Sequence, residues 1–408
     1  MRLIFLTHQY PYPLFHAGVI ATYNLIKQLC AHAHEIILVA ISDQPHAIPD
    51  GGDDLAEHVA HLERLRRPCL TTASGALTNL FASKPYTLSK YHFRHDENLL
   101  ADLVERHHPD LVYCDHLHTA HHGVLLKNRC KLPILLHQHN VESTIMNRLA
   151  HEHRNPAVRL FAKIQYRKLI RYESRIIGEF DRVIALTDKD KQAFEQMNAG
   201  ARVVAIPHGI DLAYFLPGPE SEEERAILTA GSLHWLPNQE GARWFLDEVF
   251  PRIIAQEPRA KFYLVGNAPP KDLVARASER IIVTGLVDDV RPYHDRAQVF
   301  VVPLHIGSGM RMKILNAFAM EKAVVSTPVG AEGLTCRDGE HILIAQDPGA
   351  FADAVVKLIR TPELRQRLGK NGRELVEREY SWGGVTRRIC DVLDEVVRDS
   401  GEKATTSG

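Results

Sequence analysis

Two successive series of short apolar runs, separated by stretches of helical periodicity, limit the fold of this chain more than any other feature of its sequence. Apolar runs of about four to eight residues suit buried strands, and helical patterns between them predict βαβ units on parallel sheets. The predicted strands of the first series are Leu3–Thr7, Glu35–Ile41, Leu111–Cys114, Pro133–His137 and Arg182–Leu186. Those of the second series are Ala226–Ala230, Lys261–Val265, Ile281–Thr284, Val299–Val302, Ala323–Ser326 and His341–Ala345.

An amphipathic helix is predicted between the first two apolar runs. Val19, Tyr23, Ile26 and Leu29 recur there at spacings of three and four residues. Residues at these spacings share one face of a helix, so we expect this face to pack against the sheet. The second series is followed by three further predicted helices, roughly 349–360, 362–378 and 382–398.

A cluster of proline, glycine and acidic residues separates the two series. The apolar run 202–206 is followed by Pro207, by Pro217-Gly218-Pro219 and by the acidic run Glu220–Glu224. Breakers and charge of this kind mark a domain boundary. We therefore predict domains over 1–206 and 225–380 with a linker over 207–224, then a helix within 381–400 and a frayed tail over 401–408.

The composition argues against several classes of protein. Of the 408 residues, 45% are hydrophobic and 24% charged, and the formal net charge is −1, so no nucleic-acid partner is expected. No apolar run approaches the roughly 20 residues of a membrane span, and the run within Met1–Thr7 is too short for the core of a signal peptide. The six cysteines form no close pairs, which is typical of a reducing compartment, so we expect a cytoplasmic enzyme.

The loop after Val299–Val302 has the character of an anion site. Gly307 and Gly309 let the backbone turn tightly, and a predicted helix starts near Met310. Arg311 and Lys313 then stand in its first turn, where they oppose the helix dipole. Two cations at that place make sense if an anion such as a diphosphate binds between them. The alternative is a pair of solvated cations on an ordinary loop.

Several segments of the chain resemble glycosyltransferase family 4, whose members are retaining enzymes of the GT-B fold. The segment from Gly307 to Glu332 is similar to the donor-site pattern G-x-G-x-R-x-K of that family, followed by Ala323–Gly333, which is similar to its P-V-V-x-T-x-x-G-x-E-G. Further similarity covers Gly231–Asn238, Ile206–Phe215 and the H-N-V-E within Leu136–Glu142. The resemblance implies an α/β chain with two Rossmann-like domains whose parallel sheets face a central cleft. It also implies that the final helix returns to pack on the first domain.

The resemblance implies a donor site mainly in the second half of the chain. Its residues would be Gly18, Gly231, Gly307, Ser308, Gly309, Met310, Arg311, Lys313, Asn316 and Glu332. The family often places two glutamates where this chain has Ser308 and Asn316, and the second of them holds the donor ribose. An amide in place of that carboxylate would weaken donor binding by about 1 kcal/mol. The family's Gly-Gly is Ala17-Gly18 here, which leaves Gly18 to approach the donor phosphate.

Polar residues that follow two predicted strands of the first half are candidates for the sugar side of the reaction. The resemblance places Asp115, His116 and His118 in the loop that faces the sugar, without choosing among them, and Arg311 and Lys313 beside the departing diphosphate. The acceptor side would be formed by His139, Asn140 and Glu142. A zinc site is the alternative for these clustered histidines. Without a H-E-x-x-H pattern or a cysteine partner, we expect no metal.

A stripe of basic residues recurs every fourth position in the stretch 159–175. It consists of Arg159, Lys163, Arg167, Arg171 and Arg175, and a separate apolar face carries Val158, Phe161, Leu169, Tyr172 and Ile176. One interpretation is a solvated helix whose apolar face packs on its domain. The other is docking on an anionic membrane surface.

These observations predict a sugar transfer from a nucleoside-diphosphate sugar to a saccharide or lipid-linked acceptor, with retention of configuration and without a metal or other cofactor. By resemblance, the context is bacterial polysaccharide or glycoconjugate synthesis, in the cytoplasm or at the inner face of the plasma membrane. Three alternatives stay open at this point: a nucleotide-sugar epimerase, a non-catalytic GT-B subunit that binds nucleotide, and a metal-dependent hydrolase.

Overall fold

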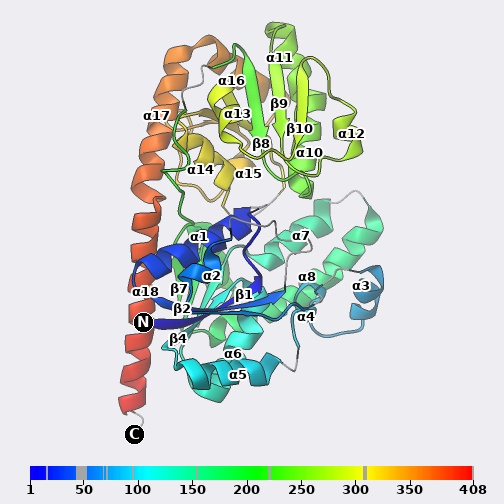
Figure 1. Cartoon of the computed structure of the whole chain (residues 1–408). Helices are drawn as coiled ribbons and strands as arrows, with labels where there is room; N and C mark the ends of the chain where they lie inside the picture. The colour runs from blue at the N-terminus through cyan, green and yellow to red at the C-terminus, as the bar shows by residue number, and fades with distance from the viewer. Residues whose placement is uncertain are drawn as a thin grey trace. The chain divides into compact units, whose positions relative to one another are not determined.

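The chain divides into two compact units in the computed structural model shown in Figure 1. The structure describes residues 1–14, 17–42, 53–67, 69, 72–93, 96–152, 155–218, 222–306 and 310–406. The first unit consists of Met1–Pro207 together with Val385–Gly408, and the second of His208–Gly384. Each unit contains its own parallel sheet and its own buried core.

The first unit is built on a seven-stranded sheet with the order β3-β2-β1-β4-β5-β6-β7. Its strands are β1 (Arg2–Gln9), β2 (Glu35–Ser42), β3 (His61–Arg64), β4 (Leu111–Asp115), β5 (Ile134–Gln138), β6 (Arg182–Ala185) and β7 (Val203–Ala205). All neighbouring pairs are parallel. The five strands predicted for this half are present, because their apolar runs are buried on both faces. The edge strand β3, with the polar sequence HLER, was not predicted.

Helices cover both faces of this sheet, with α1 on one side and α5 and α6 on the other (Figure 1). The helices are α1 (Ala17–Ala31), α2 (Leu55–His58), α3 (Ala73–Asn79), α4 (Tyr86–Ser89), α5 (Asp96–His107), α6 (Ala120–Cys130), α7 (Glu142–Glu152), α8 (Pro156–Ile176) and α9 (Asp188–Met197). Val19, Tyr23, Ile26 and Leu29 are all buried, which confirms the predicted inner face of α1.

The second unit repeats the plan with six parallel strands in the order β10-β9-β8-β11-β12-β13. The strands are β8 (Ala226–Ala230), β9 (Lys261–Val265), β10 (Ile281–Gly285), β11 (Val299–Val302), β12 (Ala323–Ser326) and β13 (Leu343–Ile344). Its helices are α10 (Leu236–Trp244), α11 (Phe250–Gln256), α12 (Lys271–Val274), α13 (Arg291–Arg296), α14 (Met312–Ala319), α15 (Pro328–Ala331), α16 (Pro348–Arg360) and α17 (Pro362–Glu379), with a π-helical turn over Phe245–Val249.

The strand orders place a topological switch point in each unit. In the first sheet the order reverses between β1 and β4, and in the second between β8 and β11. Ligands of open parallel sheets bind outside the carboxyl ends of strands at such points. Two parallel sheets with helical connections confirm the predicted α/β class with two Rossmann-like units.

The last helix, α18 (Trp382–Thr406), belongs to the first unit from Val385 onward. Ile389, Leu393 and Val396 lie on its buried side. The Arg182 guanidinium lies 3.2 Å from a carboxylate oxygen of Glu395, which joins β6 to this helix. The predicted frayed tail over 401–408 is wrong for residues 401–406, because the helix continues to Thr406. In the part of the chain that the structure describes, no helix has both the length and the apolar character to cross a membrane.

We expect Leu393→Ala to lower the free energy of unfolding by about 2–5 kcal/mol, because it leaves a cavity beneath α18. Asp391→Ala changes an exposed residue of the same helix and should stay within about 0.5 kcal/mol of the parent chain. Urea unfolding followed by circular dichroism measures both values. Equal stabilities of the two variants would contradict the packing of α18 on the first unit.

Candidate active site

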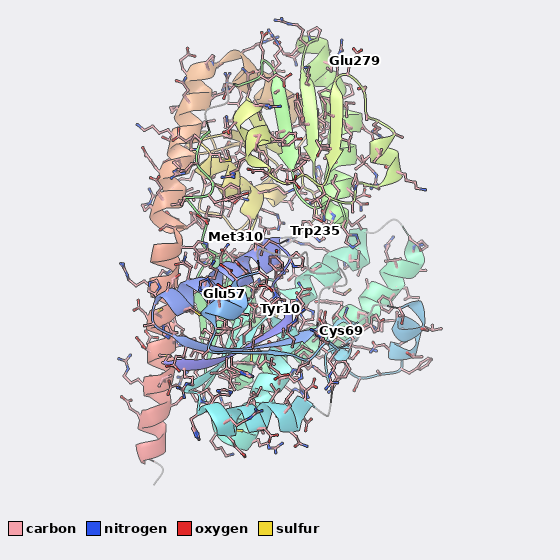
Figure 2. The ribbon with its side chains drawn as sticks, viewed as in Figure 1. Tyr10, Glu57, Cys69, Trp235, Glu279 and Met310 are labelled. Carbon is pink, nitrogen blue, oxygen red and sulfur yellow. The ribbon has the colours of Figure 1, made fainter. Side chains whose placement is uncertain are left out.

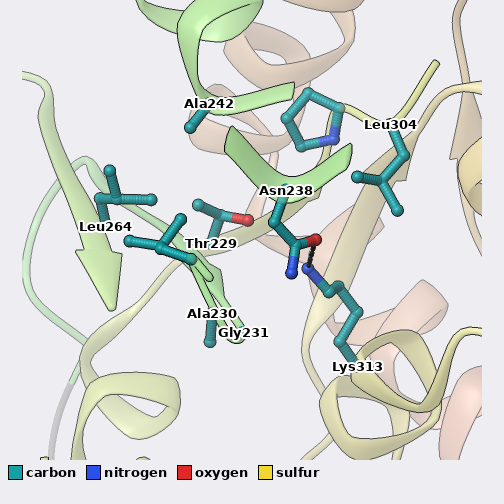
Figure 3. Close-up of a pocket in the computed structure, with 10 residues that line it drawn as sticks. Thr229, Ala230, Gly231, Asn238, Ala242, Leu264, Leu304 and Lys313 are labelled. Atoms are coloured by element: carbon teal, nitrogen blue, oxygen red, sulfur yellow. Dashed lines mark hydrogen bonds between the residues drawn. The ribbon is translucent and has the colours of Figure 1, made fainter. Parts of the chain in front are cut away.

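A small pocket lies at the switch point of the second sheet (Figure 3). Its wall is formed by residues of β8 and β9, of the segments that follow β8 and β11, and of the helices α10 and α14: Thr229, Ala230, Gly231, Leu233, Asn238, Ala242, Leu264, Pro303, Leu304 and Lys313. Trp235 and Met310, which precede α10 and α14, lie at the same end of this unit (Figure 2). Met310, which follows the predicted donor loop in the sequence, therefore lies at the same end of the second unit as Trp235, which precedes the pocket helix α10.

Lys313 is the charged residue that reaches into this pocket. Its Nζ donates a hydrogen bond of 2.8 Å to Oδ1 of Asn238, drawn as a dashed line in Figure 3. Burial, and next the nearby Arg311 cation, lower the pKa of Lys313 to about 7. The ammonium is thus close to losing its proton at neutral pH. A bound anion would restore the charged form.

Gly231 is required where β8 leads into the pocket. Its φ of +146° is rarely adopted by residues with a side chain. A Cβ atom there would lie 2.8 Å from Nζ of Lys313. The glycine therefore holds open the space around the lysine ammonium. Its place in the donor site stays a prediction.

Arg311 immediately precedes α14 and is only 4% exposed. Its guanidinium lies 5.9 Å from the ring centroid of Trp235, within the range of a cation–π contact. The first turn of α14 carries no acidic residue. The amino end of the helix and both cations therefore combine into one positive site that favours an anion.

The remaining predicted donor residues have different outcomes. Gly307, Ser308 and Gly309 lie outside the described residues. Met310 and Asn316 are partly buried, before and within α14, and Glu332 follows α15. Gly18 lies in the first turn of α1, the helix that follows the switch-point strand β1 in the other unit. The assignment of ribose and sugar contacts to these residues therefore stays a prediction.

The switch point of the first sheet is organised by Asp115, the last residue of β4. One of its carboxylate oxygens accepts a 2.9 Å hydrogen bond from Oγ1 of Thr22 on α1. The other oxygen lies 2.7 Å from Nε2 of His139. Asp115 is fully buried, so its contacts hold the neighbouring side chains in place. Its carboxylate is therefore held between Thr22 and His139 and is not exposed to solvent.

His116 and His118 lie in a cluster of aromatic rings above Asp115. The ring of His116 stacks on that of His139 with centroids 3.6 Å apart. The ring of His118 stacks on that of His8, at the end of β1, with centroids 4.8 Å apart. Burial lowers the pKa of His116 well below its usual value and that of His118 to about 4. Both rings are therefore neutral at pH 7 and can donate or accept hydrogen bonds.

Two groups in this cluster bring potential metal ligands within 4.8 Å of one another. They are His8, His116 and His118, and Asp115, His137 and His139. Asp115 already binds Thr22 and His139, and Nδ1 of His137 lies 2.7 Å from the hydroxyl of Tyr113. The second group is thus a connected hydrogen-bond network in its own right. The expectation that no metal is needed stays a prediction.

The predicted acceptor residues Asn140 and Glu142 lie after β5, at the start of α7. Burial, and next the nearby carboxylate of Glu173, raise the pKa of Glu142 to about 7. Glu173, which comes from α8, accepts hydrogen bonds from the backbone N–H groups of Glu142 and Ser143 at 3.1 and 3.0 Å. It therefore fixes the amino end of α7 beside His139.

Thr22, Glu173, Asn238 and His8 contribute to these sites and were not predicted from the sequence. Thr22 and Glu173 are polar residues placed among the apolar positions of α1 and α8, and such an interruption is a signal that could have identified them. Asn238 was noted only as part of a turn pattern. Its partner Lys313 is 75 residues away in the chain, so no local pattern links the two.

Comparisons with known families agree with this geometry. Residues 18–214 match the model described as Glycosyltransferase Family 4, and residues 224–361 match that described as Glycosyl transferases group 1. The chain belongs to the family 4 glycosyltransferases. The two matches include every residue that the sequence predicted for the two sites.

Curated relatives of this family 4 chain are known from bacteria. It is 26% identical over 280 residues to the lipopolysaccharide core biosynthesis mannosyltransferase LpcC of Rhizobium leguminosarum bv. viciae, covering 64% of this chain and 78% of that protein. It is 29% identical over 244 residues to a phosphatidyl-myo-inositol mannosyltransferase of Mycobacterium leprae, covering 57% and 62%. The matched stretch thus spans less than two thirds of the second relative, and only 42% of a protein from the cps region of Klebsiella pneumoniae.

Solved structures share the fold over almost the whole chain. Sucrose-phosphate synthase from Thermosynechococcus elongatus has a TM-score of 0.76 at 17% identity, covering 98% of this chain and 99% of that one. Anabaena Alr3699/HepE in complex with UDP-glucose has a TM-score of 0.66 at 15% identity, covering 97% and 100%. These likenesses confirm the predicted GT-B type of α/β fold.

We expect Lys313→Met to leave the ligand-free protein as stable as the parent, within about 1 kcal/mol, because the lysine ammonium is both desolvated and repelled by Arg311. Lys322→Met is the matched control. The Lys322 Nζ donates a 2.9 Å hydrogen bond to the carbonyl oxygen of Asp295 and lies 3.7 Å from Glu222, so its loss should cost about 1–3 kcal/mol. Urea unfolding at pH 7 measures both. A larger loss for Lys313→Met would mean that its charge is satisfied within the protein.

Proposed function

We propose that this protein transfers a sugar from a nucleoside-diphosphate sugar to a saccharide or lipid-linked acceptor, with retention of the anomeric configuration. The observation that carries the proposal is the positive site formed by Arg311, Lys313 and the amino end of α14. A desolvated lysine ammonium near a second cation is costly unless an anion binds beside it. A diphosphate supplies that charge, and the structural neighbour HepE has been solved in complex with UDP-glucose.

In the proposed reaction, the second unit stabilises the leaving group. Negative charge grows on the diphosphate as the bond to the sugar breaks, and Arg311 and Lys313 meet that charge where it develops. Asn316 and Glu332 are proposed to contact the ribose and the sugar. These roles follow from the family resemblance and from the position of both residues on or beside α14 and α15.

The first unit is proposed to bind the sugar and the acceptor. The neutral ring of His116 offers a hydrogen bond to a sugar hydroxyl, and Asp115 positions it through the stacked His139. Glu142, with its pKa raised to about 7, can exchange a proton near neutral pH and is proposed to face the acceptor together with Asn140. Neither role requires a metal ion.

The relatives indicate a class of acceptor and a cellular setting for this proposal. One is named for lipopolysaccharide core synthesis and the other for mannosyl transfer to phosphatidyl-myo-inositol. Both names describe glycoconjugates with a lipid part. We propose an acceptor of that kind, and a cytoplasmic location that suits the six free thiols.

Nucleoside diphosphates should raise the melting temperature of the parent protein, and Arg311→Ala or Lys313→Ala should remove that shift. A ligand at about 100 times its Kd stabilises the folded state by about 2.7 kcal/mol. The panel is UDP, GDP, ADP and dTDP with their sugars, measured by thermal shift. Lys271→Ala, which removes an exposed cation of the same unit, should keep the full shift.

The same binding should weaken as the pH rises above 7. A bound diphosphate raises the pKa of Lys313 above its value of about 7 in the ligand-free protein. At pH values between these two pKa values, the complex therefore holds one more proton than the ligand-free protein. The affinity for the diphosphate is therefore at its full value below pH 7, and it falls as the pH rises between the two pKa values of Lys313. An affinity that is constant from pH 7 to about 9 would show that Lys313 does not titrate with binding.

His116→Ala and Asp115→Asn should lower kcat for sugar transfer by about 100-fold or more and leave the nucleotide-induced thermal shift unchanged. The assay is release of nucleoside diphosphate in the presence of acceptor, run in EDTA, with product configuration assigned by NMR. His32→Ala replaces an exposed histidine of the same unit and serves as the control.

The outcomes of that assay also separate the alternatives. Conversion of donor without acceptor would indicate an epimerase, and nucleotide binding without any turnover would indicate a non-catalytic subunit. Loss of activity in EDTA would overturn the metal-free mechanism and direct attention to the His8, His116 and His118 group.

A further inference from the structure

Three histidines of the first unit bring ring nitrogens close together at the switch point of its sheet. His8 lies near the carboxyl end of β1, and His116 and His118 follow β4, the strand that pairs with β1. Each of the three offers one ring nitrogen, and these nitrogens all lie within 4.8 Å of one another. The pairing of the two strands therefore gathers three potential metal ligands from residues that are far apart in the chain.

The arrangement of these rings is close to what a zinc ion needs. Zinc binds imidazole nitrogens at about 2.0–2.1 Å in a tetrahedron, so its ligand nitrogens lie about 3.4 Å from one another. The ring of His8 contacts both others, with its centroid 4.7 Å from that of His116 and 4.8 Å from that of His118. Shifts of about 1 Å per ring, which rotation of the side chains can supply, bring the three nitrogens into one coordination sphere.

The backbone of His116 is held in a strained conformation that keeps its side chain in this cluster. Its φ of +68° is rarely adopted by residues with a side chain. The His116 N–H donates a 2.9 Å hydrogen bond to the carbonyl oxygen of His137, and its carbonyl oxygen accepts one of 3.0 Å from Oγ1 of Thr119. Strain of this kind persists only where the surroundings fix it, and it gathers at functional sites.

A buried nitrogen and a nearby carboxylate favour a cation at this place. Nδ1 of His118 is buried, and among the residues that the structure describes none forms a hydrogen bond with it. Buried polar atoms without a partner are uncommon, and a bound ion is one of the groups that satisfy them. An oxygen of the Asp115 carboxylate lies 3.9 Å from Nε2 of His116. A carboxylate beside a ligating imidazole makes that imidazole a stronger ligand.

We propose that His8, His116 and His118 bind one zinc ion, whose fourth position stays open to water or to another ligand. Three imidazoles favour zinc over Mg²⁺ and Ca²⁺, which prefer oxygen ligands. The other group of potential ligands is less suited, because Asp115 and His139 are already joined at 2.7 Å and an ion between them would break that contact.

Zinc at this position engages the ring of His116. The proposed sugar transfer uses the same ring to bind a sugar hydroxyl, so the metal and the sugar compete for it. Zinc therefore inhibits the transfer and is not a cofactor of it, a consequence that rests on the proposed function. The binding of the metal itself is independent of that function.

Metal binding is measured on the full chain without substrates, after treatment with EDTA and dialysis. Co²⁺ substitutes for zinc, and four-coordinate Co²⁺ absorbs visible light far more strongly than the hydrated ion. We expect one equivalent of Co²⁺ to give this absorption and one equivalent of Zn²⁺ to abolish it, whereas excess Mg²⁺ leaves it unchanged. His8→Gln and His118→Gln should each lower the zinc affinity by at least about 100-fold, because even the loss of a group beside a ligand costs about 10–100-fold.

The matched control is His121→Gln, which removes one imidazole from the separate cluster of His92, His121 and His122 on the same unit. It should bind zinc as the parent does. Three results would each overturn the zinc site: visible absorption no stronger than that of hydrated Co²⁺, a thiolate-to-cobalt band in the near ultraviolet, which would mean cysteine ligands, or equal zinc affinities of all three variants. An unchanged melting temperature of the metal-free variants excludes misfolding.

Inhibition is measured in the sugar-transfer assay by titration with zinc in the absence of a chelator. Activity should fall in proportion to the fraction of the site that zinc occupies in the competition with Co²⁺. Full activity with the site occupied would overturn the competition with the sugar. A protein that transfers no sugar in EDTA would contradict the proposed function, and the cobalt absorption would still decide on the zinc site.

Discussion

In each unit the first strand at the switch point pairs in parallel with strands on both sides, β1 with β2 and β4, and β8 with β9 and β11. Parallel strands all end at the same edge of a sheet, and the connections from two strands at a switch point lead to opposite faces. Because these two connections diverge, a space is left between the loops that follow the two strands. Asp115 and the histidines occupy that place in one unit, and Gly231 and Lys313 occupy it in the other. The position of both candidate sites depends on this pairing.

Both sites contain charged groups that are buried from water, but the partners of these groups differ between the two sites. In the first unit Asp115 is buried with hydrogen bonds to both carboxylate oxygens, and the surrounding histidines are neutral. In the second unit Lys313 has one neutral partner, Asn238, and a like charge, Arg311, nearby. A network of hydrogen bonds gives a rigid scaffold, whereas a buried lysine ammonium near a second cation gives an affinity for anions. The difference suits a division between positioning the sugar and holding a diphosphate.

The fold could be predicted wherever the burial of an element leaves an apolar pattern in its local sequence. The central strands are apolar because both faces are covered, and the inner face of α1 is visible in its spacing. The edge strand β3 was missed because it is held by backbone pairing of Ile37 with His61 and its neighbours, which leaves no apolar pattern. In the sites, residues that follow strands were found, since loops after parallel strands share an edge. Their partners Thr22 and Asn238 were not, because hydrogen bonds across 93 and 75 residues leave no trace in either local segment.

The return of α18 to the first unit has a consequence for biosynthesis. Residues 208–384 form a contiguous unit and contain all of its strands. The first unit, in contrast, needs its side chains from Val385 onward, which leave the ribosome after residues 208–384. During translation the second unit can therefore complete its core while the first still lacks Ile389, Leu393 and Val396. The first unit, although most of it is synthesised first, can therefore complete its core only after the whole of the second unit has been synthesised.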